Sequence, residues 1–283
     1  MINMMKNEYN KDAVLVDENL ETQITTITLN RPEKRNAINT DVFLGLQDAI
    51  DKIVTSKTRV VIITGRDEYF SSGVDLNMIN SSFVKKEDLG GVDMASPPIF
   101  RYGNSTSPQH IFSKLERMEI PVIAKISGYC IGMAMELSLA CDFRFCTEST
   151  IFSLMEPKVG LIADVGGTSR LTRLVGIPNA TDILLTARKF DGNEAFRMGF
   201  VNGVAKNNEE LEVLVKKYTD ELIDSAPLAV GLGKKLIKAC YGKDVYHGME
   251  LESLAQSMLL QTKDLKIGVI ARMQRKKPKW TNR

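Results

Sequence analysis

The stretch PVIAKISGYCIGMAMELSLACDFRFCTE (121–148) decides the fold of this chain. Its first part, PVIAKISGYC (121–130), and its last part, DFRFCTE (142–148), are apolar runs of strand character. Between them lies IGMAMELSLA (131–140), whose small and long apolar residues predict a helix. The stretch therefore predicts a strand, a helix and a second strand in close succession.

The same alternation extends toward the N-terminus. QITTITLN (23–30) predicts a strand, and TDVFLGLQDAIDKIV (40–54) has apolar residues at helical spacing, with Thr40 as its N-cap. RVVIITG (59–65) is a continuous β-branched run, which is typical of a strand that is covered on both faces. Because strands and helices alternate from about residue 23 to 205, we expect α/β layers.

The rest of the chain divides into three parts. Its pattern is helical after residue 208 and includes a long amphipathic stretch over 244–276. The one loop-like gap lies at 80–108, and we expect it near a functional site. The sequence thus predicts a flexible N-terminus (1–11), an α/β core (12–207) and a C-terminal helical region (208–283).

Composition excludes several classes of protein. The chain has 283 residues, is 43% hydrophobic and carries a formal net charge of +2, so it supports a large core and predicts no nucleic-acid partner. Its four cysteines and two histidines form no CxxC or HExxH motif, so we expect neither a metal site nor a disulfide scaffold. We find no signal peptide and no apolar run of about 18 residues, which predicts a cytoplasmic protein without a membrane partner.

Three carboxylates lie in apolar surroundings. Glu156 and Asp164 lie in FSLMEPKVGLIADVGGTSRL (152–171), and Glu136 lies in the helical stretch quoted first. A carboxylate in such company loses hydration, so a function is expected for it. Each also has a purely structural interpretation: Glu136 on a solvent-facing helix surface, Glu156 at the end of a surface strand, and Asp164 as a helix N-cap.

The chemistry follows from what lies beside these acids. A glycine-containing turn, YFSSGVDLNM (69–78), follows the strand at 59–65, and N–H groups in such a turn or at a helix start can hold an oxyanion. The chain offers no nucleophilic Ser-His pair. Carboxylates beside two such donors indicate proton transfer next to a stabilised enolate. GGTSRL (166–171) lacks the lysine of a phosphate-binding loop.

Four segments in order resemble the crotonase (enoyl-CoA hydratase/isomerase) superfamily, and the resemblance runs from about residue 12 to the C-terminus. They are LNRPEKRNAIN (29–39), FSSGVDL (70–76), PVIAKISGYCIGMAMELSLACDFR (121–144) and EPKVGLIADVGGTSRLTRLVG (156–176). The resemblance implies an α/β fold built as a spiral of β–β–α turns. It also implies a C-terminal helical trimerisation region, a homotrimer or homohexamer, and acyl-CoA thioesters as ligands.

The resemblance also assigns roles to residues. The backbone N–H groups of Val74 and Met133 fall on the family's oxyanion hole. Glu136 and Glu156 fall on the two glutamates with which hydratases add water to a 2-enoyl-CoA. Asp164 falls on an acidic position of the dienoyl-CoA isomerase branch, although that branch usually has aspartate where this chain has Glu136.

The resemblance places coenzyme A against two loops. The residues expected to contact it are Arg35, Asn36, Ala37, Ser72, Asp75, Leu76 and, from the C-terminal helices of a neighbouring subunit, Arg275. Arg272 and Lys276 lie beside Arg275 in the same basic cluster. No cofactor is expected apart from the coenzyme A of the substrate.

The function predicted is that of an enoyl-CoA hydratase/isomerase-type enzyme that adds water across a carbon–carbon double bond or moves that bond. A Δ(3,5)-Δ(2,4)-dienoyl-CoA isomerase is one alternative, and a non-catalytic scaffold or RNA-binding protein of the same fold is another. Acyl chain length and branching, metabolic pathway, and the choice between trimer and hexamer stay open.

Overall fold

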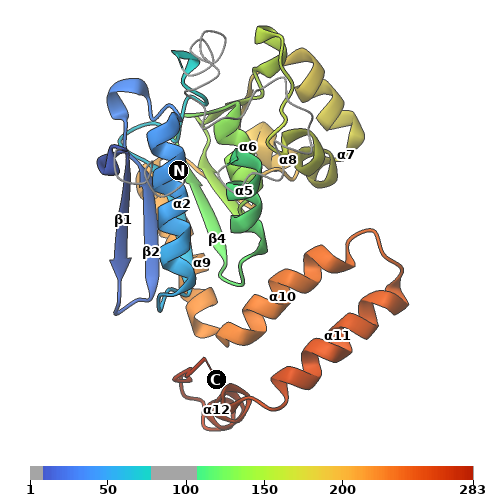
Figure 1. Ribbon diagram of the computed structural model, residues 1–283. Helices are drawn as coiled ribbons and strands as arrows, with labels where there is room; N and C mark the ends of the chain where they lie inside the picture. Colours follow the sequence, from blue (N-terminus) through green and yellow to red (C-terminus); the bar gives the residue numbers. More distant parts are fainter. Residues whose placement is uncertain (1–8, 78–106, 283) are drawn as a thin grey trace, which may run out of the picture.

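The computed structural model describes residues 9–77 and 107–282 (Figure 1). Residues 1–8 of the predicted flexible N-terminus therefore lie outside the described residues, as do residues 80–106 of the predicted loop. From Tyr9 onward the chain contacts the body, because the Tyr9 hydroxyl donates a hydrogen bond of 2.6 Å to Asp48.

A six-stranded sheet forms the centre of the molecule in the order β1-β2-β3-β4-β6-β9. β1 pairs antiparallel with β2, and every other neighbouring pair is parallel. The strands are β1 (Val14–Asn19), β2 (Ile24–Leu29), β3 (Val60–Gly65), β4 (Val122–Ile126), β6 (Phe143–Thr147) and β9 (Gly203–Ala205).

A second, three-stranded sheet lies beside the first in the order β5-β7-β8. Its strands are β5 (Tyr129–Ile131), β7 (Ile151–Ser153) and β8 (Phe190–Asp191). The prediction of one strand over 121–130 is wrong, because β4 ends at Ile126 and β5 belongs to this other sheet. The chain turns at Gly128, which has φ +59°, where a side chain would collide with the Glu68 carbonyl oxygen.

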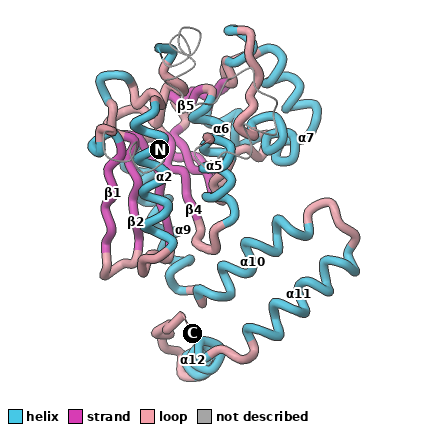
Figure 2. The backbone as a smooth tube through the Cα atoms, in the orientation of Figure 1, coloured by secondary structure: helices cyan, strands magenta, loops and turns pink. Residues whose placement is uncertain are grey.

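Each such change of sheet is followed by a helical segment. β4 and β5 lead into α6 (Met133–Leu139), which Figure 2 shows beside β5. β6 and β7 lead into the short 3₁₀ helix η3 (Glu156–Val159) and then α7 (Gly167–Thr186). This repetition is the predicted spiral of β–β–α turns.

Helices cover both faces of the large sheet. α2 (Thr40–Val54) and α5 (Pro108–Arg117) lie on one face, and α9 (Asn208–Asp224) lies on the other (Figure 1). In β3, Val61 packs with the α2 side whereas its neighbour Val60 packs with α9, and both are fully buried. This confirms the prediction of a strand covered on both faces.

The remaining helical details correct one expectation. α2 has the predicted bounds, but its N-cap is Asn39, whose side chain accepts a 3.1 Å hydrogen bond from the Val42 N–H. Thr40 is the first residue of the helix. α7 is interrupted at Gly176 (φ +77°), shortly before a proline, and the short helix α8 (Gly192–Arg197) follows β8.

The C-terminal region consists of helices, as predicted. The amphipathic stretch over 244–276 forms two helices, because Thr262 caps the start of the second one. After α9, which packs on the sheet, α10 (Pro227–Cys240), α11 (Val245–Leu259) and α12 (Lys263–Met273) extend away from the body (Figure 1).

Candidate active site

Two glycine turns bring two backbone N–H groups together. Gly73 (φ +91°) precedes Val74, and Gly132 (φ +55°) precedes Met133 at the start of α6. A methyl group on Gly73 would lie 2.5 Å from the Ile131 carbonyl oxygen and 3.7 Å from the Met133 nitrogen, so the turns are in direct contact. Within the described part of the chain, neither the Val74 nor the Met133 N–H donates a hydrogen bond. Both donors are therefore available to a ligand.

Glu136 lies on α6, one turn after Met133. Its side chain is only 1% exposed, which excludes the solvent-facing interpretation. Its Oε1 atom accepts hydrogen bonds of 2.9 Å from the N–H groups of Val165 and Gly167. Burial, followed by the negative charge of Glu156, raises the pKa of Glu136 to about 8, although the two hydrogen bonds act in the opposite direction.

Glu156 begins η3 and faces α6. A methyl group on Gly132 would lie 2.8 Å from its Oε1 atom, which places this carboxyl beside the start of α6. Its Oε2 atom is buried and has no hydrogen-bond partner among the described residues. Burial, and then the charge of Asp164, raise the pKa of Glu156. An unpartnered buried carboxyl oxygen is unusual in a folded chain and marks a place where a polar ligand group fits.

Asp164 lies in the loop between η3 and α7, and its side chain is exposed. It is not a helix N-cap, because α7 begins after Gly166. Its charge contributes to the raised pKa of Glu136 and of Glu156, so it lies near both. The Gln109 amide approaches its Oδ2 at 3.4 Å from α5.

The carboxyls of Glu136 and Glu156 form a coupled pair. Each has a raised pKa, and burial is the largest cause of both shifts. Two neighbouring carboxyls do not lose their protons independently. A raised pKa suits a carboxyl that must donate a proton while its neighbour accepts one, as a combined general acid and general base requires.

The two loops expected to contact coenzyme A lie side by side. The Ser72 N–H donates to the Arg35 carbonyl at 2.9 Å, and Arg31 pairs with Asp75 at 3.0 Å. Arg35 is exposed and its guanidinium lies 5.8 Å from the centre of the Tyr129 ring. The described part of the loop that contains Ser72 and Asp75 ends with the exposed residues Leu76 and Asn77.

Asn36 and Ala37 have a structural part in the same turn. The Asn36 side chain is buried, donates to the carbonyls of Arg66 and Tyr69, and accepts from the Arg31 N–H. The Ala37 carbonyl accepts from the Arg31 guanidinium. Their predicted contact with coenzyme A stays a prediction.

Arg275 lies beyond the end of α12, at the opposite end of the molecule from α6 (Figure 1). Within one chain it is therefore not brought to the two loops. Its predicted role requires a second subunit, as the sequence analysis assumed, and stays a prediction.

Sequence reasoning missed the groups that hold Glu136 in place. They are the N–H groups of Val165 and Gly167 and, behind them, Arg170. All three lie within or next to GGTSRL (166–171), for which the sequence predicted no contact with Glu136. The signal available was the Gly-Gly pair: a methyl group on Gly167 would lie 2.7 Å from Glu136 Oε1, so only glycine lets the two segments approach.

Comparison with known proteins identifies the family. The family model described as enoyl-CoA hydratase/isomerase matches residues 19–283. The chain belongs to the enoyl-CoA hydratase/isomerase family. This confirms the resemblance seen in the sequence, the crotonase-like fold and the prediction of an enzyme of the enoyl-CoA hydratase/isomerase class.

Relatives in this family bear two kinds of name. The chain is 31% identical over 98% of its length to a peroxisomal Δ(3,5)-Δ(2,4)-dienoyl-CoA isomerase of Arabidopsis thaliana, and covers 99% of that protein. It is 33% identical over 91% of its length to a crotonyl-CoA hydratase of Syntrophomonas wolfei, and covers 94% of it. The crystal structure of an enoyl-CoA hydratase from Bacillus anthracis superposes with a TM-score of 0.83 at 29% identity, over 96% of this chain and 100% of that one.

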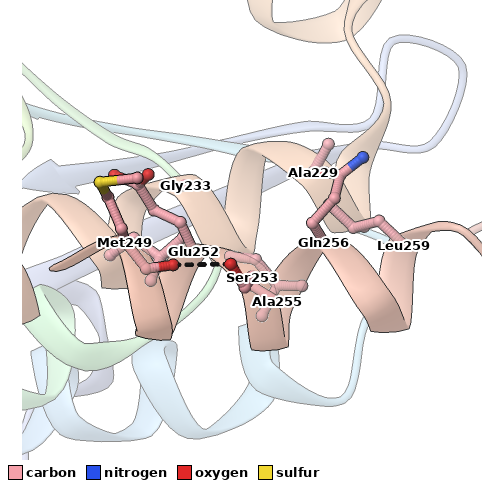
Figure 3. Close-up of a pocket in the computed structure, with 10 residues that line it drawn as sticks. Ala229, Gly233, Met249, Glu252, Ser253, Ala255, Gln256 and Leu259 are labelled. Atoms are coloured by element: carbon pink, nitrogen blue, oxygen red, sulfur yellow. Dashed lines mark hydrogen bonds between the residues drawn. The ribbon is translucent and has the colours of Figure 1, made fainter. Parts of the chain in front are cut away.

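A groove outside the carboxylate site lies between α10 and α11 (Figure 3). Its volume is about 580 Å³, and its lining is mostly apolar. In Figure 3, Met249, Ser253 and Gln256 line it from α11, and the Ser253 hydroxyl donates to the Met249 carbonyl at 2.8 Å. None of the three acids contributes to this groove, and its open form fits a protein surface better than a small substrate.

Two further findings concern the residues at 9–77 and 107–282. None of their helices is both long enough and apolar enough to cross a membrane. Within the same residues, no three side chains of the metal-binding types are arranged to hold a metal ion.

Proposed function

We propose that this chain hydrates 2-enoyl-CoA thioesters. The observation that carries the proposal is the pair formed by the buried Glu136 and the half-buried Glu156 beside the N–H groups of Val74 and Met133, which donate no hydrogen bond within the described residues. The two N–H groups polarise the thioester oxygen, and the two carboxyls supply and accept one proton each. The predicted roles are Glu136 as the base and Glu156 as the acid.

The proton balance of the addition is simple. A water molecule loses a proton to Glu136 as its oxygen forms a bond to Cβ, and the electrons of the double bond move onto the thioester oxygen. The resulting enolate is held by the Val74 and Met133 N–H groups. When it collapses, Cα takes the proton of Glu156. The carboxyl pair then still holds one proton, now on Glu136.

The same pair serves the reverse direction. In the loss of water from a 3-hydroxyacyl thioester, Glu156 takes the proton from Cα and Glu136 returns a proton to the leaving oxygen.

Isomerisation of a 3,5-dienoyl-CoA is the second candidate. It is favoured by Asp164, whose charge acts on both glutamates, and the isomerase of Arabidopsis thaliana is among the similar proteins. Hydration remains the first candidate, because Glu136 is buried and Glu156 half-buried, whereas the Asp164 side chain is exposed.

A non-catalytic scaffold or RNA-binding protein fits the site less well. Removing the Glu136 carboxyl from water near the charge of Glu156 destabilises the folded state, and a scaffold gains nothing in return. The net charge of +2 also offers little attraction to RNA.

The test uses two substrates and three matched variants. Purified protein is incubated with crotonyl-CoA and, in parallel, with a 3,5-dienoyl-CoA, and the products are identified. We expect Glu136→Gln to abolish hydration and spare any double-bond shift, Asp164→Asn to do the reverse, and Glu156→Gln to damage both.

Circular dichroism controls for folding in each variant. Three folded variants that keep wild-type turnover on both substrates contradict the assignment of the acids. A wild-type protein that converts neither substrate contradicts the proposed reaction.

We further propose that α10, α11 and α12 bind neighbouring subunits in a trimer or hexamer. Large apolar side chains are exposed along these helices in the single chain, among them Tyr246, Leu254, Met258 and Met273. Exposed apolar side chains gathered on one region commonly mark a protein–protein contact. In the assembly, Arg275 of one subunit would approach the coenzyme A bound by Arg35 and Ser72 of another.

Two further expectations from the sequence concern the cofactor and the location in the cell. One is that the coenzyme A of the substrate is the sole cofactor, which activity in the presence of a strong chelator tests. The other is a cytoplasmic location, although relatives carry peroxisomal and mitochondrial names. Cell fractionation with an antibody to the native protein tests the location.

A further inference from the structure

A continuous series of hydrogen bonds leads away from Glu136 to the C-terminal helices. It begins at the turn formed by residues 165–167, where the N–H groups of Val165 and Gly167 both donate to Glu136 Oε1 at 2.9 Å. These two donors fix the position of the carboxyl. The turn itself is held by a second set of hydrogen bonds.

Arg170 holds the turn from behind. Its Nη1 atom donates to the Val165 carbonyl at 2.9 Å. Val165 is thus held through its carbonyl by Arg170, while its N–H group donates to Glu136. A side chain on Gly166 (φ +96°) would collide with Arg170 Nη1, so the guanidinium occupies space that only a glycine leaves open. The Arg170 side chain is 14% exposed, which shields these bonds from water.

Glu116 on α5 fixes the guanidinium in turn. Its Oε2 atom accepts from Arg170 Nε at 3.1 Å and from Nη2 at 3.0 Å, and Ser113 accepts from Nη2 at 3.2 Å. Its Oε1 atom accepts from Lys238 of α10 at 2.9 Å. Although burial raises the pKa of Glu116, its bonds to Lys238 and Arg170 prevail and hold the pKa below the usual value, so the carboxylate is ionised.

We propose that Arg170 is a positioning residue for Glu136, and that Glu116 and Lys238 connect Arg170 to α10. These three side chains control the geometry of the two N–H donors and take no part in the chemistry themselves. The proposal rests on the proposed function only in that Glu136 takes part in the reaction. Its effect on the Glu136 carboxyl is a property of the free protein and can be measured without a substrate.

Arg170, Glu116 and Lys238 also affect the pKa of Glu136, because they hold the turn in place. The N–H groups of Val165 and Gly167 stabilise the ionised carboxyl, whereas burial and the facing charges of Glu156 and Asp164 oppose ionisation. If the turn moves, the donors are weakened and the pKa of Glu136 rises above its value in the wild type. The carboxyl pair must hold one proton to act, so turnover falls at high pH, where that proton leaves. This fall is the basic limb of the pH profile. A higher pKa of Glu136 moves it to higher pH.

The principal variant is Arg170→Lys, which keeps the charge next to Glu116 but cannot reach Glu116, Ser113 and the Val165 carbonyl together. We expect kcat to fall about 10- to 100-fold with KM changed less than about twofold, because the carboxyl is misplaced rather than removed. We expect the basic limb to shift upward. Lys238→Met removes only the bond between Lys238 and Glu116, and we expect a smaller shift of the basic limb in the same direction. This variant replaces Arg170→Lys as the test if Arg170→Lys does not fold.

The matched control is Lys235→Met. Lys235 also lies on α10 and pairs with Glu119 at 2.5 Å, but that pair does not lead to the turn. We expect it to leave kcat and the pH profile unchanged. A folded Arg170→Lys variant with a wild-type kcat and basic limb overturns the proposal, and so does a Lys235→Met variant that loses as much kcat as Lys238→Met.

A second readout separates this proposal from the proposed function. The infrared band of the protonated Glu136 carboxyl is assigned by difference against Glu136→Gln and titrated in the free protein. An upward shift of the titration in Arg170→Lys supports the positioning role even if wild type converts neither substrate. An unchanged titration overturns the positioning role even if wild type is an efficient hydratase.

Discussion

Burial sets the behaviour of Glu136. The side chain is almost fully removed from water and faces a second carboxyl, so its ionised form is disfavoured in spite of two N–H donors. In the unfolded chain the same group titrates as an ordinary glutamate. The difference makes this residue a source of pH-dependent stability as well as of chemistry.

We predict that Glu136→Gln stabilises the protein more as pH rises. With a folded-state pKa of about 8, Glu136 keeps a proton in the folded chain that the unfolded chain releases above its ordinary pKa. Stability contributed by Glu136 is therefore present at about pH 4 and lost as pH rises to about 8, whereas glutamine does not titrate. Thermal unfolding at about pH 5 and about pH 8.5 should show a larger gain in Tm at the higher pH. An equal gain at both would mean that Glu136 titrates normally.

A second residue-scale prediction concerns the Val74 N–H. Val74→Pro deletes this donor, whereas Val74→Ala keeps it. None of the hydrogen bonds around the turn uses that donor: Ile38 N–H donates to Gly73 and Asp75 N–H donates to Ile38. Loss of one oxyanion donor should lower kcat on the order of 10²–10³-fold. Circular dichroism must first show that the proline variant folds, because Gly73 has a positive φ; a folded proline variant with normal turnover removes Val74 from the mechanism.

At the scale of the element, α10 is joined to the body by one buried ion pair. Lys234 Nζ lies 2.6 Å from Asp142 Oδ2 and donates to the carbonyls of Leu115 and Ile120. Burial lowers the pKa of Lys234 and raises that of Asp142, so each ion depends on the other to remain charged. This contact lies where the middle of α10 meets the end of α5 and the loop before β4.

We predict that Lys234→Met destabilises the protein by about 3–5 kcal/mol, because it leaves Asp142 buried without its partner. The double variant Lys234→Met/Asp142→Asn should lose less, since the asparagine oxygen still accepts from the Val122 N–H. Urea unfolding monitored by fluorescence measures both. The exposed pair of Lys235 and Glu119 is the control, and Lys235→Met should cost less than about 1 kcal/mol. Similar losses for Lys234→Met and Lys235→Met would refute a special role for the buried pair.

At the scale of the whole molecule, the C-terminal helices do not form a closed core. α11 and α12 carry exposed apolar side chains in the single chain, and a groove of about 580 Å³ opens between α10 and α11. The body, in contrast, buries its apolar residues on both faces of the large sheet. The two parts differ in the way that a folded core differs from a subunit interface.

We predict that Leu254→Glu disrupts the assembly without unfolding the chain. Leu254 is 66% exposed in the single subunit, so a charge there is harmless to the fold but unfavourable in an apolar interface. Light scattering after size-exclusion chromatography should show a smaller mass than for wild type. Val213→Glu on α9, at 71% exposure, is the control and should keep the mass. An unchanged mass for Leu254→Glu would place the interface elsewhere.

Replacing the basic cluster is a sharper test of the coenzyme A contact than truncation after residue 271. Truncation also removes Thr281 and Asn282, which donate to the buried Asp264. Arg272→Gln combined with Arg275→Gln keeps those contacts. If these residues reach coenzyme A across a subunit contact, affinity for coenzyme A should fall while the assembly mass stays constant, as measured by calorimetry and light scattering. Unchanged affinity would exclude the cluster from the binding site.

The family, most elements of the fold and the three candidate acids could be predicted from the sequence alone. The local pattern is enough for α2, whose apolar residues recur at helical spacing, and for β3, which is a continuous β-branched run. Four ordered motifs are enough for the family, because they carry the residues whose backbone or carboxyl groups form the site. The region after residue 208 was predicted as helical on the same basis.

Only the tertiary structure decided what depends on contacts between distant segments. The run over 121–130 has the local pattern of one strand, but the turn at Gly128 sends its halves into two sheets. Nothing local to Arg170 reveals that it supports Val165 and reaches Glu116, because hydrogen-bond partners far apart in the chain leave no periodic signal. The raised pKa values of Glu136 and Glu156 are likewise caused by burial and by neighbouring charges, which exist only once η3, α6 and the start of α7 have come together.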